Sequence, residues 1–517
     1  MKTQINFGNL IRDLKKSKLW ISSAPALFQN CYPWVIGFID MKKYLGFGFR
    51  IVPNALKSNY VWQFIDEDEN YLITKRIFEM YAKKTLFDKF KIWQSFREKL
   101  TENFRYLDKT NLKKLSNKEL VKTYLEFMKN LTNEWTIPLV MEGTAIYTEK
   151  KLFPEFKKEL SGFNNKLVNE YFAVLTQPEK LSFIGNERLS FLNLCFLILK
   201  NKKLFLALKK RRTVILEIKS NYPDFYYKLL RHQENFYWVR NNYLRAEPIN
   251  ISGFFLFLKE ELKNKSRSEI NKEYRNWRDY AENTSKRKKR ILKKIRIPKK
   301  LKKEIEAISF FTSCFDIRKE VALRSSYYLI KILKELAKRI KINYFLLDKA
   351  LPGEMAKIIQ EGKKKWRGIL TQRKKKAVSV YQLNFKPEIY SGKKADDLWE
   401  VLFEEEGTGV KSVDGITVSQ GGKDYVKGKV RIVFNPFKDD FKAGEILVAT
   451  MTRPDFLPLV KKAKAIVTDE GGMTCHAAII SRELNIPCIV GTKKATKVFQ
   501  NGDRITLRLN HGKVEKI

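Results

Sequence analysis

Apolar positions in the middle of the chain recur with the period of an α-helix. In the stretch SNKELVKTYLEFMKNLTNEW (116–135), Leu120, Tyr124 and Phe127 fall on one face of such a helix. Ser116 stands directly before this stretch and Glu119 follows three residues later, which is the arrangement of a capping box. The pattern continues to about residue 380 with few glycines, so it predicts a mostly helical region.

Both ends of the chain have a different pattern. Residues 31–40 (CYPWVIGFID) and 46–53 (GFGFRIVP) are short apolar and aromatic runs that favour strands. From about residue 405, turn-forming residues alternate with short β-branched runs, which are GKVRIVF, EILVAT, KAIVTD, PCIVGT and RITLRL. Two helical segments lie between these runs, near 453–462 and 474–484, so we predict a compact C-terminal α/β module.

Together these patterns predict a multidomain α+β fold with a large, mostly α-helical N-terminal and middle region and a C-terminal α/β module. We expect an N-terminal α+β region at 1–115, a mostly helical domain at 116–391, a linker or hinge at 392–411 and the module at 412–517. A length of 517 residues suffices for several domains.

The formal net charge of +45 is extreme and allows two explanations. Such a field attracts nucleic acid or other polyanions, and residues 286–303 hold 12 Lys or Arg and no acid. The abundance of Lys, Asn, Ile, Phe and Tyr also fits a compositional bias that acts on the whole chain. Aromatic residues do not interleave the basic run, which argues against a single-strand binding site, so nucleic acid stays a possible but less favoured partner.

Cysteine and hydropathy patterns exclude further classes of site. The five cysteines form no CxxC pair, so we expect buried free thiols and no zinc or other metal site. The N-terminus is too charged for a secretory signal, and no apolar run reaches the roughly 20 residues of a membrane span. We therefore expect a cytoplasmic protein.

The chain has only three histidines, and His476 lies in GGMTCHAAIISREL (471–484). Gly471 and Gly472 allow a positive φ or the close approach of a ligand, and Thr474 is a candidate N-cap. His476 then falls in the first turn of a helix, where free backbone N–H groups attract phosphate and disfavour an imidazolium. A neutral imidazole is a nucleophile, so the pattern is compatible with phosphoryl transfer through this histidine and also with a histidine that only caps the helix or packs locally.

The stretch from GEILVATMTRPDF to NGDRITL (444–507), which includes this motif, resembles the phosphohistidine swivelling (mobile) domain of phosphoenolpyruvate-utilising enzymes. It is most similar to phosphoenolpyruvate synthase and rifampicin phosphotransferase-like proteins, here without an ATP-grasp domain. Met473 stands where the synthase branch commonly has arginine and the dikinase branch has methionine, so the branch stays open. More diffuse resemblances to the helical region of these proteins occur at 173–194 and around His232.

The resemblance implies roles for individual residues. His476 would be the phosphorylated residue, and Gly471, Gly472, Thr474 and Cys475 would support the phosphate. Further candidates are Thr452, Arg453 and Asp455 in the preceding turn, Arg482 on the following helix, and His232. His232 is either a core or surface residue or part of an acceptor site, and His511 is expected at the surface.

Enzymes of this family also need a phosphoryl donor site, and neither a glycine-rich phosphate loop nor a βα barrel is evident in residues 1–400. We therefore expect a phosphotransferase component that carries a phosphoryl group on His476 from a donor to an acceptor such as pyruvate or another small molecule. The donor would be Mg-ATP on a separate ATP-grasp chain, or phosphoenolpyruvate, with a hinge at roughly 392–425. No cofactor is expected on this chain itself. A basic nucleic-acid-binding protein with a vestigial swivelling domain, or a regulatory partner of a complete synthase, are the alternatives.

Overall fold

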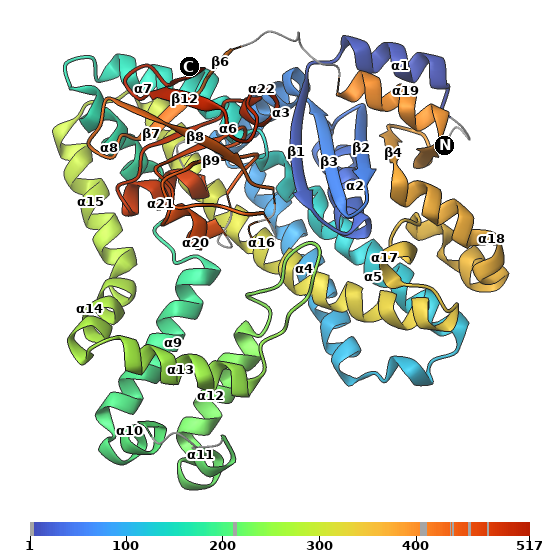
Figure 1. The fold of residues 1–517 in the computed structure, drawn as a ribbon, viewed down its shortest axis with the longest axis horizontal. Helices are drawn as coiled ribbons and strands as arrows, with labels where there is room; N and C mark the ends of the chain where they lie inside the picture. The colour runs from blue at the N-terminus through green and yellow to red at the C-terminus, as the bar shows by residue number, and fades with distance from the viewer. Residues whose placement is uncertain are drawn as a thin grey trace.

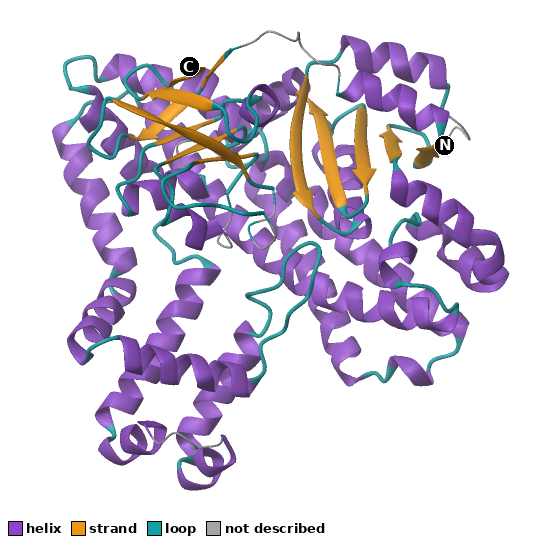
Figure 2. Ribbon diagram, in the orientation of Figure 1, coloured by secondary structure: helices purple, strands orange, loops and turns teal. Residues whose placement is uncertain are grey.

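The computed structural model describes residues 5–209, 215–403, 411–434, 436, 439–452, 456–472 and 475–517, and of residues 165, 166, 476, 479, 482 and 483 it describes only the backbone. Over these ranges the chain is mostly helical and contains two sheets, as Figure 1 and Figure 2 show. One of the sheets belongs to a C-terminal α/β region. The predicted fold class is confirmed at this level of detail.

The N-terminal sheet is antiparallel and joins the two ends of the first 400 residues. Its order is β1-β3-β2-β4-β5, with β1 (Leu19–Pro25), β2 (Ile51–Lys57), β3 (Tyr60–Asp66), β4 (Ala377–Gln382) and β5 (Glu388–Ser391). β2 and β4 pair from Ile51 opposite Gln382 to Leu56 opposite Ala377. Residues 377–391, which the expected domain division assigns to the helical domain, thus complete the sheet of the first 66 residues. The division itself stays a prediction.

Helices cover both faces of this sheet. α2 (Phe28–Leu45) packs on one face, and α1 (Phe7–Lys16) and α19 (Lys393–Leu402) pack on the other. The strand expected at 31–40 is therefore wrong, because this apolar run is buried on several sides and lacks the alternation that separates a strand from a buried helix. The expected linker at 392–411 likewise begins with a helix, since Ala395, Leu398 and Leu402 form an apolar face that packs on the sheet.

The helical region lies between β3 and β4 in the chain and contributes many residues to the main core. Its first helices are α3 (Glu67–Ala82), α4 (Leu86–Lys109), α5 (Asn117–Thr136), α6 (Thr144–Tyr147), α7 (Phe153–Glu159) and α8 (Asn165–Thr176). Its last helices are α15 (Tyr280–Lys294), α16 (Lys299–Arg339), α17 (Tyr344–Leu347) and α18 (Met355–Lys375). The capping box of Ser116 and Glu119 at the start of α5 is confirmed. α16 has 41 residues, about 60 Å of helix, and packs on α3, α4, α5 and α8.

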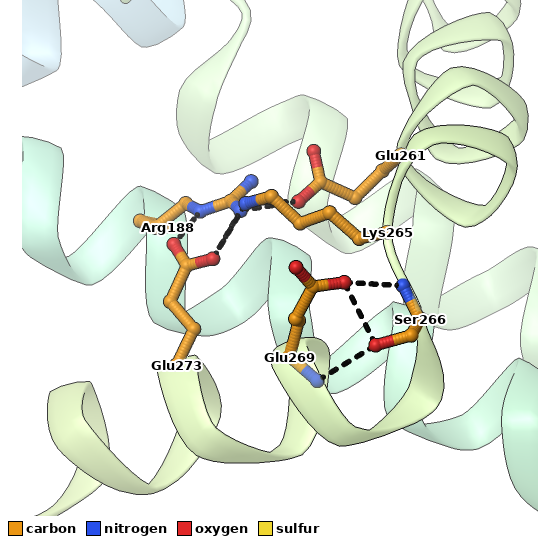
Figure 3. Close-up of polar contacts among 6 residues, drawn as sticks. All are labelled: Arg188, Glu261, Lys265, Ser266, Glu269 and Glu273. Atoms are coloured by element: carbon orange, nitrogen blue, oxygen red, sulfur yellow. Dashed lines mark hydrogen bonds and ion pairs between the residues drawn. The ribbon is translucent and has the colours of Figure 1, made fainter.

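Between α8 and α15 the chain forms a helical arm with its own core, at the lower left of Figure 1. It comprises α9 (Phe183–Lys200), α10 (Lys202–Lys209), α11 (Ile215–Asn221), α12 (Pro223–Phe236), α13 (Ile251–Asn264) and α14 (Arg267–Arg278). Arg188 donates to both carboxylate oxygens of Glu273, at 2.7 and 2.9 Å, and also to Glu261 (Figure 3). Burial opposes the ionisation of Glu273, but hydrogen bonds from Arg188 and Lys265 outweigh burial and lower its pKa to about 2. The ion-pair network thus fastens three helices of the arm.

The C-terminal module contains the second sheet, in the order β6-β13-β12-β8-β9-β10-β11-β7 over the described residues. These strands are β6 (Ser412–Asp414), β7 (Ile416–Ser419), β8 (Tyr425–Ile432), β9 (Ile446–Ala449), β10 (Ala465–Thr468), β11 (Cys488–Val490), β12 (Arg504–Arg508) and β13 (Lys513–Lys516). β8, β9, β10 and β11 are parallel neighbours, and the other pairs are antiparallel. The five strands expected from the β-branched runs are confirmed.

Short helices cover the two faces of the second sheet. α20 (Leu457–Val460) and α21 (His476–Glu483) pack on the face that belongs to the main core, and α22 (Ala495–Val498) packs on the other. Ala477 and Ala478 of α21 are fully buried, so this helix lies close to the sheet. None of the described helices is long and apolar enough to cross a membrane.

Candidate functional site

The candidate site lies at the carboxyl ends of the parallel strands β9, β10 and β11. Because parallel strands end at the same edge of a sheet, the loops after β9 and β10 lie side by side. A hydrogen bond joins the two loops, since the backbone N–H of Glu470 donates to the carbonyl oxygen of Thr450 at 2.8 Å. The loop after β10 leads into α21, whose first helical residue is His476. The expectation that His476 falls in the first turn of a helix is confirmed for the backbone. Its side chain lies outside the described residues.

Gly471 and Gly472 have different roles. Gly471 has φ +114°, a conformation that L side chains rarely adopt, and a Cβ there would lie 2.7 Å from Sγ of Cys475. Gly472 is outside the positive-φ region, and its Cβ would meet nothing nearer than Cβ of Ala145 on α6, at 4.0 Å. A Cβ added at Gly491 would lie 2.9 Å from the carbonyl oxygen of Gly471. The tight turn that sequence reasoning allowed at both glycines is thus required only at Gly471.

Two carboxylates hold the loop in place. Asp469 accepts hydrogen bonds from the backbone N–H and hydroxyl of Thr496 and so anchors the loop to α22. Glu470 accepts a hydrogen bond from the N–H of Ser23 on β1 at 3.2 Å, which ties the module to the N-terminal sheet. Burial, together with the neighbouring charge of Asp469, raises the pKa of Glu470 well above its usual range.

A cavity of about 650 Å³ separates this edge of the module from the rest of the protein. The module contributes Met451, Thr452, Glu470, Gly471, Gly472, Cys475 and Ala477 to its wall. β1 and α2 contribute Trp20, Ser22, Ser23, Cys31 and Trp34, and the helices around α16 contribute Trp135, Glu142, Ala145, Phe153, Phe172, Phe315, Arg318 and Lys319. The volume is within the range of about 300–1,000 Å³ that small-molecule sites have. Gly471, Gly472 and Cys475 therefore face a space that is large enough to hold a small molecule.

Of the residues expected at the site, the structure brings Gly471, Gly472, Cys475 and Thr452 together at this cavity. Thr474, Arg453 and Asp455 lie outside the described residues, as does the side chain of Arg482. Their roles stay predictions. Among the described residues, no group of three or more His, Cys, Asp or Glu side chains is placed to hold a metal ion.

The other two histidines lie elsewhere. His232 is 2% exposed in the core of the helical arm, where Nδ1 is 2.8 Å from the hydroxyl of Ser190 and Nε2 is 3.5 Å from a carboxylate oxygen of Glu187. It does not line the cavity. His511 is exposed in the turn between β12 and β13.

Sequence reasoning missed Arg318, Glu142 and the tryptophans of the cavity wall. Arg318 had a detectable signal, because it stands four residues from both Cys314 and Ala322 on the buried face of α16. An arginine in such a position needs a partner or a ligand. The tryptophans gave no such signal, since they come from segments that are far apart in the chain.

The basic stretch 286–303 spans α15 and the start of α16, and part of it packs inside the protein. Ile291, Ile295 and Leu301 belong to the main core. Nζ of Lys288 is 3.1 Å from the hydroxyl of Ser309 and 3.4 Å from Glu179, and burial lowers the pKa of this lysine. The stretch therefore has a structural use, and nucleic-acid binding through it stays a prediction.

The cysteines behave as expected for buried thiols. None of the five forms a disulfide with another described residue, and Cys475 is half-buried while the others are buried. Burial raises the pKa of Cys195 and of Cys314 to about 12. These thiols are therefore protonated at neutral pH and have little nucleophilic character.

Known proteins are similar to this chain in its C-terminal module. Residues 441–512 match the family model described as PEP-utilising enzyme, mobile domain. A probable phosphoenolpyruvate synthase of Archaeoglobus fulgidus is 47% identical over 118 residues, which are 22% of this chain and 15% of that protein. The phosphoenolpyruvate synthase of Pyrococcus furiosus is 54% identical over 90 residues, 17% of this chain and 11% of that protein. That of Deinococcus radiodurans is 43% identical over 136 residues, 26% of this chain and 17% of that protein.

The matched part thus spans between 11% and 17% of the length of these three relatives. Among solved structures, holo aconitase X of Thermococcus kodakaraensis aligns with 21% of this chain and 99% of its own, at 17% identity and a TM-score of 0.17, which supports no inference. The resemblance of the C-terminal module to the mobile domain of PEP-utilising enzymes is confirmed over residues 441–512.

Proposed function

We propose that the C-terminal module carries a phosphoryl group on His476 and transfers it to a small molecule in the cavity between the module and the rest of the protein. The observation that carries the proposal is the position of Gly471, Gly472 and Cys475, which line that cavity directly before α21. The match of residues 441–512 to a family of phosphoryl-transfer proteins supports it.

In the first half of the proposed reaction, a neutral imidazole nitrogen of His476 attacks the phosphorus of the donor. The P–O bond to the leaving group breaks as the N–P bond forms, and the leaving group keeps the electron pair. The first turn of α21 offers backbone N–H groups and a positive helix end to the phosphoryl oxygens, and the same end keeps the imidazole neutral. The donor is Mg-ATP on a separate ATP-grasp chain, or phosphoenolpyruvate.

In the second half, a hydroxyl oxygen of the acceptor attacks phosphorus. The N–P bond breaks, its electron pair returns to the imidazole, and the acceptor's proton passes to solvent. The acceptor occupies the cavity, whose exposed surface is mainly apolar. In this proposal the module moves between donor and acceptor, as a swivelling domain does.

Phosphoramidate tests the first half without a donor protein, because it phosphorylates imidazole directly and releases ammonia. We expect an acid-labile label on His476 that forms at least about 10-fold faster than on the exposed His511, owing to the anion-binding end of α21. Mapping by mass spectrometry identifies the labelled residue. His476→Asn should lose the fast phase, and the matched control His511→Asn should keep it.

Two results would contradict the proposal. One is equal labelling rates for the two residues, and the other is a fast phase that persists in His476→Asn. ATP labelled at the β or γ position, given with Mg²⁺ and this chain alone, should leave His476 unlabelled. Robust labelling would place the donor site in this chain and overturn the separate donor.

A further inference from the structure

The basic stretch 286–303 presents its charges on the outside of the protein, along α15 and the start of α16. Of its 12 Lys and Arg side chains, all except that of Lys288 are exposed. Lys286 pairs with Glu282 and Lys288 lies near Glu179, but the remaining ten make no ion pair with a described residue. None of the residues in this stretch lines the cavity, so the charges form a surface that is separate from the candidate site.

On α15 the exposed cations share one side of the helix. At about 3.6 residues per turn, positions 286, 287, 289, 290, 293 and 294 lie within an arc of about 160°. From 286 to 294 this arc holds only cations and is about 12 Å long. Thr284 and Ile291 are buried on another side of the helix, which fastens α15 to the protein.

The stability of the two helices does not account for this density of charge. Like charges four residues apart on a helix repel each other, and Arg290 stands four residues from both Lys286 and Lys294. Lys299 and Lys300 lie in the first turn of α16, which holds no acid and where the positive end of the helix disfavours cations. The charges therefore weaken the helices that carry them.

A bias toward lysine across the whole chain does not account for the charge density either. Other exposed helical segments keep an acid three or four residues from a cation, as Asp88 and Lys91 do on α4 and Glu361 and Lys365 do on α18. In contrast, the 18 residues of this stretch contain no acid at all. The stretch thus has the properties of a surface that binds a polyanion.

The chemistry of the surface favours one class of polyanion. A nucleic-acid duplex carries about one negative charge per 1.7 Å of its axis, so several phosphates can face α15 at once. The stretch has no aromatic residue on which the bases of a single strand could stack. Protein interfaces are anchored by aromatic and apolar side chains and are poor in lysine, whereas nine of these 12 cations are lysines.

We propose that the outer face of α15 and the start of α16 bind the phosphate backbone of a nucleic-acid duplex without reading its sequence. Because α15 packs on the protein along one side, it cannot insert into the major groove as a recognition helix does. Its cations reach the phosphates instead, which carry no sequence information directly. The inference does not rest on the proposed function, because His476 and the cavity take no part in it.

Fluorescence anisotropy of a labelled duplex of about 20 base pairs measures binding to the full chain. DNA and RNA duplexes of the same sequence are titrated between about 0.05 and 0.3 M KCl. Each phosphate contact adds about 0.9 to the slope of log affinity against log salt, which is about 5-fold in affinity at 0.15 M. Arg290→Gln, Lys293→Gln and Lys294→Gln together should remove two or three contacts, so affinity at 0.15 M should fall by about 25- to 125-fold and the slope by about 2–3.

The matched control is the combination Lys364→Gln, Arg367→Gln and Lys375→Gln on α18. It also removes one arginine and two lysines that are exposed and make no ion pair with a described residue. α18 lies at the right of Figure 1 and α15 at the left, and salt screens charges over about 8 Å at 0.15 M, so the control should bind within about 3-fold of the wild type. Equal losses in the two variants, or an unchanged slope in the α15 variant, would overturn the proposal.

Two comparisons test the chemical class of the partner. Duplexes of different sequence should bind within about 3-fold of each other, and a preference above about 10-fold would contradict contact with phosphates alone. Poly-L-glutamate with the same number of charges should compete at least about 10-fold less effectively than unlabelled duplex, because its charges are more widely spaced. Equal competition would mean that the surface takes an acidic polypeptide and that the proposal is wrong. Binding of either duplex supports the proposal, and a preference between them identifies the partner as DNA or RNA.

A measurement on the wild type keeps the proposal testable if the α15 variant does not fold. Acetylation of lysines, followed by mass spectrometry, shows which side chains a saturating duplex covers. Lys293, Lys294 and Lys300 should react at least about 5-fold more slowly with duplex present, whereas Lys364 and Lys375 should change by less than about 2-fold. Equal protection of both sets, or protection of neither, would refute binding at α15.

Discussion

Alanine at Gly471 is expected to destabilise the loop before His476 far more than alanine at Gly472. At Gly471 the added Cβ must adopt φ +114° and lie 2.7 Å from Sγ of Cys475. The backbone conformation costs about 1–2 kcal/mol and the forced contact about 1–3 kcal/mol, so we expect a total of about 2–5 kcal/mol. At Gly472 the added Cβ would meet no atom nearer than 4.0 Å, and the backbone φ is not positive. Gly472→Ala should therefore change the stability of the loop by no more than about 1 kcal/mol.

Hydrogen exchange followed by mass spectrometry measures the local destabilisation of the loop in the full chain. A loss of 2 kcal/mol raises the exchange rate of amides that open with the loop by about 30-fold, so peptides that cover 471–484 should exchange at least that much faster in Gly471→Ala. Phosphoramidate labelling of His476 should fall in parallel. Peptides of the helical arm should be unchanged in both variants, and they serve as the internal control.

The contact with Cys475 can be separated from the backbone conformation. In a Cys475→Ala background the 2.7 Å contact with Sγ is absent, while a contact with Cβ at 3.2 Å stays, so Gly471→Ala should cost less there but not become harmless. Equal exchange in Gly471→Ala and Gly472→Ala would refute the reasoning. It would mean that the loop tolerates a side chain where the structure leaves no room for one.

Two further predictions concern the regions that support the site. Glu273 has a pKa lowered to about 2 from an ordinary value of 4.5, so it stabilises the fold fully above pH 4.5 and loses this contribution as the pH falls toward 2. The free energy of unfolding, measured in urea, should therefore fall more steeply between pH 5 and 2 in the wild type than in Glu273→Gln. Parallel plots of this free energy against pH would contradict the pairing with Arg188 and Lys265. Gly143→Ala places a Cβ 1.9 Å from the hydroxyl oxygen of Thr74, so we expect a loss of at least about 1–3 kcal/mol and a lower thermal midpoint, and an unchanged midpoint would contradict the close packing of α3 on the cavity wall.

The C-terminal module was predictable because its signals are local. Each parallel strand is a short β-branched run bounded by turn residues. The loop motif contains, within a few residues, the glycine that allows the turn at Gly471, the thiol of Cys475 and the start of α21. The same local reading identified the N-terminus of α5 from Ser116 and Glu119.

What could not be predicted depends on contacts between distant segments. α2 gave the pattern of a strand, because a helix that is buried on several sides has no polar face to reveal its period. The strand β4 carries no local sign that its partner β2 lies more than 300 residues earlier. The cavity has the same origin, since its tryptophans come from β1, α2 and α5 and meet only in the folded protein.

The pairing of β2 with β4 has a consequence for synthesis on the ribosome. About 320 residues separate the end of β2 from the start of β4, which is roughly 16–64 s of translation at 5–20 residues per second. During that interval β2 presents an unpaired edge, the kind of surface on which chains aggregate. Its neighbour β3 and the covering helix α2 are made early, whereas α19, on the other face, is made after β4. The nascent chain therefore needs its helices, or a chaperone, to shield half a sheet until the far end of the sequence arrives to complete it.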